Sequence, residues 1–313
     1  MPAGKRLITT SEGTMRAPFG TSEWLLLLTT ALMWGSSYLL IAIALEGLRP
    51  LAVAFLRVAL GLAVVSCLPS ARRRSVDRSD RLRLAALGVL WLALPLALYP
   101  IAQRHLSSSA AGMITGSQPL MAAAIAAALL RRRPLALAGA GLAVGFAGVV
   151  LVVSASATGG AADSGYASAL ILIAVACYAL ATNLAVPMQQ RYGAFVVIRG
   201  ALLVAFVLLA IPGVIALSLS APTLGSLAAM VPLGALCTGA GYVTFTTLVG
   251  RAGATRGAVA IYLVPVVAIA LGVLFRGEHP GVAALGGAVL VTLGALLVGR
   301  SRPSAPAVPK APA

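Results

Sequence analysis

The sequence has little charge and very little acid. Charged residues make up 10% of its 313 positions, only 7 of them are Asp or Glu against 23 Lys or Arg, and aromatic residues reach 5%. A soluble domain carries about 25% charged residues. With 60% hydrophobic residues and a mean hydropathy of +1.01, the chain holds more apolar surface than a single water-exposed domain can bury. These shortages exclude a soluble globular protein and predict an all-α protein embedded in a lipid bilayer.

Lysine and histidine are also scarce, and their positions exclude several enzyme classes. The two lysines, Lys5 and Lys310, lie near the ends of the chain, so a phosphate-binding loop or a Schiff base has no lysine to use. The two histidines, His105 and His279, lie between apolar segments and belong to no cluster of carboxylates. We therefore predict no enzyme activity, no metal and no cofactor. A membrane-embedded transferase and a channel or scramblase-like module are kept as alternatives.

Ten mostly apolar segments are long enough to cross a membrane as helices. A helix needs about 20 apolar residues to span a hydrocarbon core of about 30 Å. Residues 1–23 and 300–313 are expected to be tails, and the second tail, rich in Pro and Ala, to be disordered. The expected spans are residues 24–44, 50–69, 84–103, 107–130, 134–154, 167–187, 193–217, 224–248, 256–275 and 281–299.

The basic residues are distributed unequally between the two sides of the membrane. If the N-terminus is cytoplasmic, 18 of the 23 fall in cytoplasmic tails and loops, 3 fall in outer connections, and Arg57 and Arg199 fall within spans. Cytoplasmic loops of membrane proteins carry an excess of Lys and Arg. The distribution predicts that both termini lie in the cytoplasm.

The chain also contains an internal repeat. A shift of 146 residues superimposes Pro119 on Pro265, Pro134 on Pro280, Gly141 on Gly287, and Gly148 on Gly294. This shift defines a first half at residues 24–154, an outer linker at 155–166 and a second half at 167–299. Each half holds five spans, an odd number, so the halves must enter the membrane in opposite orientations. Inverted repeats of this kind are typical of secondary transporters, whose substrate site lies near the midplane between the halves.

Three strings give the chain a resemblance to a known family. They are WGSSY at Trp34–Tyr38, RPLAVAFLR at 49–57 and PVVAIALGVLFRGEHP at 265–280. With ten spans in two repeats, residues 24–299 resemble the EamA-type members of the drug/metabolite transporter superfamily. The resemblance implies an inner-membrane carrier whose two five-helix halves enclose a central cavity, and export of amino acids or other small metabolites. Gly277-Glu278 matches the second-half motif, whereas the arginines at 131–133 replace the Gly-Glu that is common in the first half.

Polar side chains within the spans are the candidates for contact with the cargo, because polar groups at bilayer depth usually face the interior of the helix bundle. No acidic residue falls in the middle of a span, so Arg57 and Arg199 lack an internal anionic partner. A substrate carboxylate is one candidate partner; the alternative is that each guanidinium binds backbone carbonyls or extends to the membrane surface. The other candidates are the aromatic or amide residues Trp34, Tyr38, Tyr99, Gln118, Tyr178, Asn183 and Tyr262, with Pro119 and Pro265 as hinges.

The sequence thus favours a secondary transporter that moves a small anionic or zwitterionic, amino-acid-like metabolite across the inner membrane by alternating access. Export is implied by the resemblance alone. No nucleic-acid partner is expected, because the basic residues lie between apolar runs and not on a face shared with aromatic residues. Proton coupling and facilitated diffusion both stay open, as do a monomer and a homodimer.

Overall fold

The computed structural model describes residues 20–72, 76–129, 135–156, 161–252, 257 and 259–300, and all regular elements in these ranges are helices. This agrees with the predicted all-α class. Residues 1–19 and 301–313 of the two predicted tails and the basic run at 131–133 lie outside the described residues, as do Pro134 and Arg256. The end of the first tail, from Thr21, and Arg300 of the second belong to helices instead.

The first half folds into helical elements that are in places much shorter than the predicted spans. They are α1 (Thr21–Ala44), α2 (Pro50–Ser66), α3 (Pro69–Arg72), the 3₁₀ turn η1 (Arg78–Asp80), α4 (Arg81–Leu87), the π-helical η2 (Gly88–Ala93), α5 (Leu94–Ala102), α6 (Ser108–Thr115), α7 (Gln118–Leu129) and α8 (Ala136–Ser156).

The second half contains the longer helices. They are α9 (Ala161–Tyr192), α10 (Ala194–Ser218), α11 (Leu224–Val231), the π-helical η4 (Pro232–Ala240), α12 (Gly241–Ala252), α14 (Val259–Arg276) and α15 (Val282–Arg300).

Eight helices in the described ranges are long and apolar enough to cross a membrane. The chain is therefore an integral membrane protein, and eight of the ten predicted spans meet this criterion. The second predicted span, α2, has 17 residues, about 25 Å at 1.5 Å per residue. The fourth is broken into α6 and α7 just before Pro119, which takes a first-turn position of α7, where its missing N–H costs nothing.

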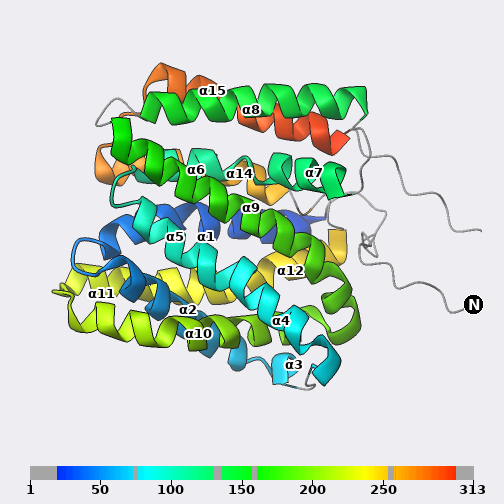
Figure 1. Ribbon diagram of the computed structural model, residues 1–313, viewed down its shortest axis with the longest axis vertical. Coiled ribbons are helices and arrows are strands. Elements are labelled where there is room, and N and C mark those ends of the chain that lie inside the picture. Colours follow the sequence, from blue (N-terminus) through cyan, green and yellow to red (C-terminus); the bar gives the residue numbers. More distant parts are fainter. Residues whose placement is uncertain are drawn as a thin grey trace, which may run out of the picture.

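The helices of the two halves interleave throughout the bundle. Helix α8 packs along α15, α2 along α10, α1 along α14, and α5 along α9. In Figure 1, α8 and α15 lie together at the top edge and α10 lies at the opposite edge. Helix α1 begins, and α15 ends, at the same end of the bundle, on the right. We call this the tail end, and the opposite end, with Ala44, Ala102 and Arg276, the far end.

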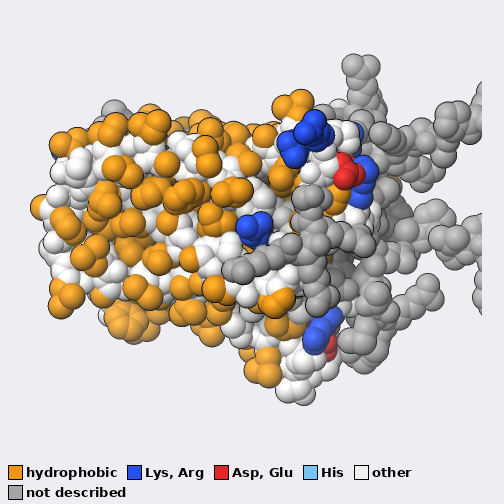
Figure 2. Space-filling view, turned by 90° about the horizontal axis from the view of Figure 1, so that it is seen from below, with side chains coloured by type: hydrophobic (Ala, Val, Ile, Leu, Met, Phe, Trp, Pro, Cys, Tyr) orange, Lys and Arg blue, Asp and Glu red, His pale blue; other side chains and the backbone are white. Residues whose placement is uncertain are grey.

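The outer surface matches a lipid environment. On the face seen in Figure 2, hydrophobic side chains cover most of the length, and most of the basic and acidic side chains gather towards the tail end, on the right. Large apolar residues such as Ile211, Leu274 and Phe275 are exposed on the helices, by 75%, 74% and 69%. Such exposure would be costly in water and is favourable in hydrocarbon.

Helices α8 and α15 touch through their backbones. A Cβ atom placed on Gly294 would lie 2.5 Å from the carbonyl oxygen of Gly141, and one on Gly287 would lie 2.7 Å from that of Gly148. Real Cβ contacts are longer, so this packing requires glycine at these positions. Small residues that allow close backbone approach are the usual means by which membrane helices associate.

Candidate functional site

A cavity of about 390 Å³ lies between the two halves. Its lining runs from the middle of α1 to residues near the tail end, including Gln189, Gln190 and Gly299, and we call it the central cavity. Eight of the eleven predicted site and hinge residues line it: Trp34, Tyr38, Arg57, Tyr99, Gln118, Pro119, Tyr178 and Tyr262. The side chain of Asn183 lies outside the described residues, and Arg199 and Pro265 are not part of the lining.

Aromatic rings form much of the cavity wall. The rings of Tyr38 and Tyr99 meet edge to face, with centroids 5.7 Å apart, and Tyr178 lies 6.2 Å from Tyr99. A second group includes residues that the sequence analysis missed. Trp91 and Tyr242 meet at 5.4 Å, and Phe245 lies 4.7 Å from Trp34. Trp91 lies within η2 and Tyr242 is the second residue of α12, just after η4, so a 3.6-residue periodicity does not predict the direction of either side chain.

Arg57 is the one charged side chain among the described residues that line the central cavity. It is only 6% exposed, and its Nε donates a hydrogen bond of 2.7 Å to Oγ1 of Thr238. The Thr238 hydroxyl in turn donates to the carbonyl oxygen of Leu233 in η4, at 3.1 Å. The guanidinium is thus oriented by a neutral partner, and no described lining residue supplies a carboxylate. A buried cation without an anionic partner is costly, and an anionic ligand would compensate this cost.

The break between α6 and α7 places further polar groups at the cavity. Thr115, at the end of α6, donates to the carbonyl oxygen of Ala111 and lies 2.9 Å from the hydroxyl of Tyr99. Gln118 and Pro119 begin α7. The chain is therefore interrupted where polar groups face the cavity, as expected for irregular backbone at membrane depth.

Pro265 has a different local structure from Pro119. Helix α14 continues through Pro265, so the break expected at both prolines is present only at the first. Pro265 is buried and packs against the break itself, since a Cβ on Gly116 would lie 2.7 Å from its Cγ. The two prolines thus lie on helices in contact, α14 and the α6–α7 pair, and only Pro119 interrupts its helix.

Arg199 does not pair with Arg57 across the repeat. Gly88 packs against Val204 and the carbonyl of Ala201, whereas Gly234 packs against Leu60 and the carbonyl of Arg57. These parallel contacts make Ala201 the structural counterpart of Arg57. The sequence analysis treated the two arginines together because each lies within a span.

Arg199 lies outside the described lining of the central cavity and contacts the end of α2. Its side chain is partly exposed, and its Nε donates to Oγ of Ser66, the last residue of α2, at 3.3 Å. A cation at a helix C-terminus is favourable for the helix dipole. Arg199 therefore lies at the end of α2, outside the described lining of the central cavity.

We predict that Arg199→Gln leaves cargo affinity unchanged. The substitution removes a cation from the C-terminal end of α2, at a cost of about 0.3–1 kcal/mol, so a small decrease in the midpoint of thermal unfolding in detergent is expected. Ligand binding to the purified variant checks this. A tenfold loss of affinity in a well-folded Arg199→Gln protein would place Arg199 in the transport path instead.

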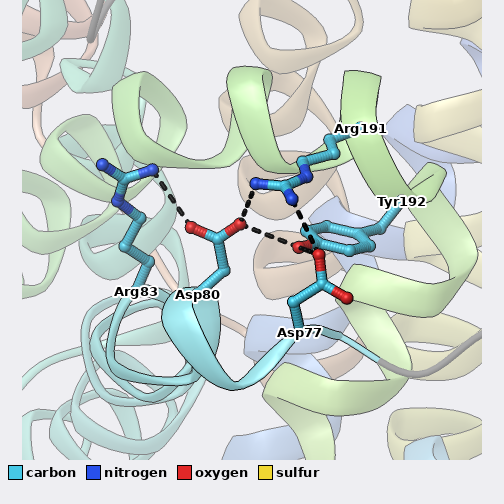
Figure 3. Close-up of polar contacts among 5 residues, drawn as sticks. All are labelled: Asp77, Asp80, Arg83, Arg191 and Tyr192. Carbon is cyan, nitrogen blue, oxygen red and sulfur yellow. Dashed lines mark hydrogen bonds and ion pairs between the residues drawn. The ribbon is translucent and has the colours of Figure 1, made fainter. Parts of the chain in front are cut away.

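A network of charged residues lies at the tail end of the cavity (Figure 3). Arg191 donates through Nη1 to Asp80, at 2.6 Å, and through Nη2 to Asp77, at 2.7 Å. The hydroxyl of Tyr192 lies 2.8 Å from Oδ2 of Asp80 and 2.9 Å from Oδ2 of Asp77, and Arg83 also binds Asp80. Burial and the two neighbouring carboxylates raise the pKa of Tyr192 to about 12, so its hydroxyl stays a donor at neutral pH.

This network fastens the first half to the second beside the cavity. Asp77 and Asp80 come from the segment around η1, while Arg191 and Tyr192 end α9, directly after the cavity residues Gln189 and Gln190. The two aspartates lie between the second and third predicted spans, and nothing in their spacing shows that the end of α9 packs against them.

A bundle of apolar helices around a buried cation and a ring of aromatic residues is the arrangement of a membrane transporter. The family model for EamA-like transporters matches the chain twice, over residues 21–154 and 165–300. The chain belongs to this family, within the drug/metabolite transporter superfamily.

Two relatives match over nearly the whole chain. An "Uncharacterized transporter" of Archaeoglobus fulgidus is 24% identical over 284 residues, which cover 90% of this chain and 99% of the relative. A "Probable terminal-alkyne amino-acid exporter" of Streptantibioticus cattleyicolor is 26% identical over 281 residues, covering 88% and 93%. A solved crystal structure shares the fold, with a TM-score of 0.62 at 20% identity, covering 89% of this chain and 96% of that one.

Proposed function

We propose that this protein is a secondary transporter that exports a small, amino-acid-like metabolite with a free carboxylate across the cytoplasmic membrane. The observation that carries the proposal is Arg57, a buried cation that faces a central cavity whose described lining holds no carboxylate. The aromatic walls suit an apolar side chain on the cargo, and Thr115 and Gln118 offer polar contacts for an amino group. The name of the Streptantibioticus relative supports an amino-acid cargo and the direction of export.

The packing of α8 and α15 supports an inverted repeat. Gly141 faces Gly294, and Gly148 faces Gly287. Under the shift of 146 residues the first contact becomes the second, which is the relation produced by a two-fold axis between the two helices. Since the helices run antiparallel, that axis lies across them and so in the plane of the membrane.

Other helix contacts are also repeated between the corresponding helices of the two halves. Helix α1 packs on α14, and its counterpart α9 packs on α6 and α7; η4 packs on α2, and its counterpart η2 packs on α10. Each half can therefore adopt the arrangement of the other. We infer that the structure represents the state in which the central cavity opens at the tail end. When each half adopts the arrangement now seen in the other half, the cavity opens at the far end instead.

We predict that the tail end is cytoplasmic. A topology reporter fused after Gly159 should be active outside the membrane, and one fused after Arg300 should be active in the cytoplasm, because the basic residues concentrate in the loops at that end. A phosphatase reporter and a fluorescent reporter at the same two positions provide reciprocal readings. If both fusions report the same side of the membrane, the inverted repeat is wrong.

Transport by the purified protein tests the function itself. In proteoliposomes, an amino acid with an apolar side chain should show saturable flux, and its carboxylate analogue without the amino group should compete. The methyl ester, which lacks the carboxylate, should not. A lipophilic quaternary ammonium dye should be a poor cargo, because no acid among the described cavity residues pairs with it. Flux that rises linearly with concentration would favour the channel or scramblase-like alternative.

A further inference from the structure

A second cavity, of about 220 Å³, lies at the far end of the bundle. Unlike the central cavity, it is lined by charged groups of both signs: Glu46, Arg104, Arg276 and Glu278, together with Gln103. We call it the far-end cavity. Its lining comes from both halves, since Glu46 follows α1 and Arg276 ends α14.

Only a thin layer of side chains separates the two cavities. On α1, Ile41 lines the central cavity and the next residue, Ala42, lines the far-end cavity. On the third span, Tyr99 lines the central cavity, and Gln103, about one helical turn further along, lines the far-end cavity. The amide nitrogen of Gln103 donates to the carbonyl oxygen of Tyr38 at 2.9 Å, behind the Tyr38–Tyr99 ring contact. A cargo that leaves the central cavity past these rings enters the far-end cavity.

Glu278 lines this cavity, and both of its carboxylate oxygens accept hydrogen bonds from the start of α6. Its carboxylate accepts hydrogen bonds from the backbone N–H groups of Ser108 and Ser109, at 2.9 and 2.8 Å, and from the Ser108 hydroxyl at 2.7 Å. Burial raises the pKa of Glu278, but these hydrogen bonds outweigh burial and lower it below the ordinary value. Glu278 thus stays ionised as the cap of α6 and is not available to a cargo.

The ion pair between Arg276 and Glu46 in this cavity, in contrast, is replaceable. Arg276 binds Glu46 through Nη1, and the two side chains are 36% and 54% exposed. Exposed ion pairs contribute little stability, so a ligand with charges of both signs can substitute for each partner. Nearby, the amide oxygen of Gln103 is buried with no hydrogen-bond partner among the described residues, and Gln103 itself is 8% exposed. A buried acceptor without a donor favours a ligand that supplies one.

We propose that the far-end cavity is an exit subsite for the zwitterionic head group of an amino acid. The cargo carboxylate binds the guanidinium of Arg276, and its ammonium binds the carboxylate of Glu46 and the amide oxygen of Gln103. In this way the cargo replaces the ion pair that joins α1 to α14 and opens the far end. The proposal rests on the proposed function and adds that the ammonium group, which has no acid in the described lining of the central cavity, is recognised at the exit.

Three probes that differ only in charge test the subsite: phenylalanine, 3-phenylpropionate and phenethylamine. Each is applied to the far-end side of oriented proteoliposomes, and inhibition of flux is measured for the wild type, Glu46→Gln and Arg276→Gln. Wild type should prefer phenylalanine over both analogues by about tenfold or more, as charge-assisted bonds require. Glu46→Gln should lose the preference over 3-phenylpropionate, and Arg276→Gln the preference over phenethylamine.

Two further variants control the experiment. The double variant Glu46→Arg, Arg276→Glu keeps both charges and should recover the zwitterion preference even if a single variant folds poorly. Arg49→Gln removes a far-end arginine that binds the carbonyl oxygen of Leu219 and lines neither cavity, so its preference should equal that of wild type. If Glu46→Gln and Arg276→Gln retain the wild-type preference while flux continues, the exit subsite is wrong and the proposed function stands. If the wild type carries none of the probes from either side, both are overturned.

Discussion

Replacing Arg57 by Gln is expected to weaken the binding of a carboxylate-bearing cargo by about tenfold to a hundredfold. Loss of a hydrogen bond to a charged group costs about 1.5–3 kcal/mol, and each 1.4 kcal/mol is a factor of ten in affinity. Arg57 lies at 6% exposure in an aromatic cavity, where water screens its charge little. Equilibrium binding of a radiolabelled amino acid to the detergent-purified variant measures the effect.

Two companion variants separate the charge of Arg57 from its structural bond. Thr238→Val removes the hydrogen-bond acceptor of Arg57 but leaves the guanidinium in place, so its loss of affinity should be smaller. Arg57→Lys keeps the charge but not the planar fork that matches a carboxylate, and should be intermediate. If Arg57→Gln melts at the wild-type temperature and binds the cargo with wild-type affinity, Arg57 is not the partner of the carboxylate.

The composition of the chain was enough to predict the charged residue of the central cavity. A chain with seven acids, none of them in the middle of a span, leaves an intramembrane arginine without an internal anion, and this reasoning selected Arg57. The same reasoning also selected Arg199, which lies against the end of α2. Composition and depth do not show which face of a helix a residue occupies, and the packing of Gly88 on Ala201 was needed to separate the two arginines.

The helix geometry was predictable only in part. The fourth span is interrupted just before Pro119, because a proline has no N–H to donate to the carbonyl four residues earlier, at Thr115, and its ring clashes with that carbonyl in a continuous helix. Pro265, the repeat partner of Pro119, lies within a continuous helix, supported by its contact with Gly116. The π-helical segments η2 and η4 begin with Gly88 and Pro232, but glycine and proline also occur in the ordinary helices of this chain and do not distinguish a π-helix from them. These two segments nevertheless direct Trp91 into the cavity wall and place Thr238 next to Arg57.

The family strings acquire physical roles in the structure. In WGSSY, Trp34 and Tyr38 line the cavity, whereas Gly35 packs directly against Val267 of α14. In the third string, Gly277 has a positive φ of 60°, which glycine tolerates best, and this turn presents Glu278 to the start of α6. The sequence contained these residues, but Gly35 and Glu278 contact segments 170 positions or more away along the chain, which the sequence does not show to be neighbours.

The last prediction concerns the glycines between α8 and α15. Substituting alanine at Gly141, Gly148, Gly287 or Gly294 is expected to destabilise the protein by about 1–3 kcal/mol each, the usual cost of overpacking. In each case the new Cβ would lie within 2.5–2.7 Å of the backbone of the facing helix, which cannot move aside as a flexible side chain would. The midpoint of unfolding in detergent, read from tryptophan fluorescence, measures the loss.

Two glycines on the same helices provide matched controls. A Cβ at Gly139 or Gly286 would meet nothing within 4 Å, so alanine there should be neutral or stabilise the helix by about 0.5–1 kcal/mol. Because the repeat equates Gly141 with Gly287 and Gly148 with Gly294, the members of each pair should lose similar stability. Wild-type unfolding of all four variants would show that the backbones are not in contact. A large effect confined to one member of each pair would leave α8 and α15 packed without the two-fold relation on which the proposed alternating access depends.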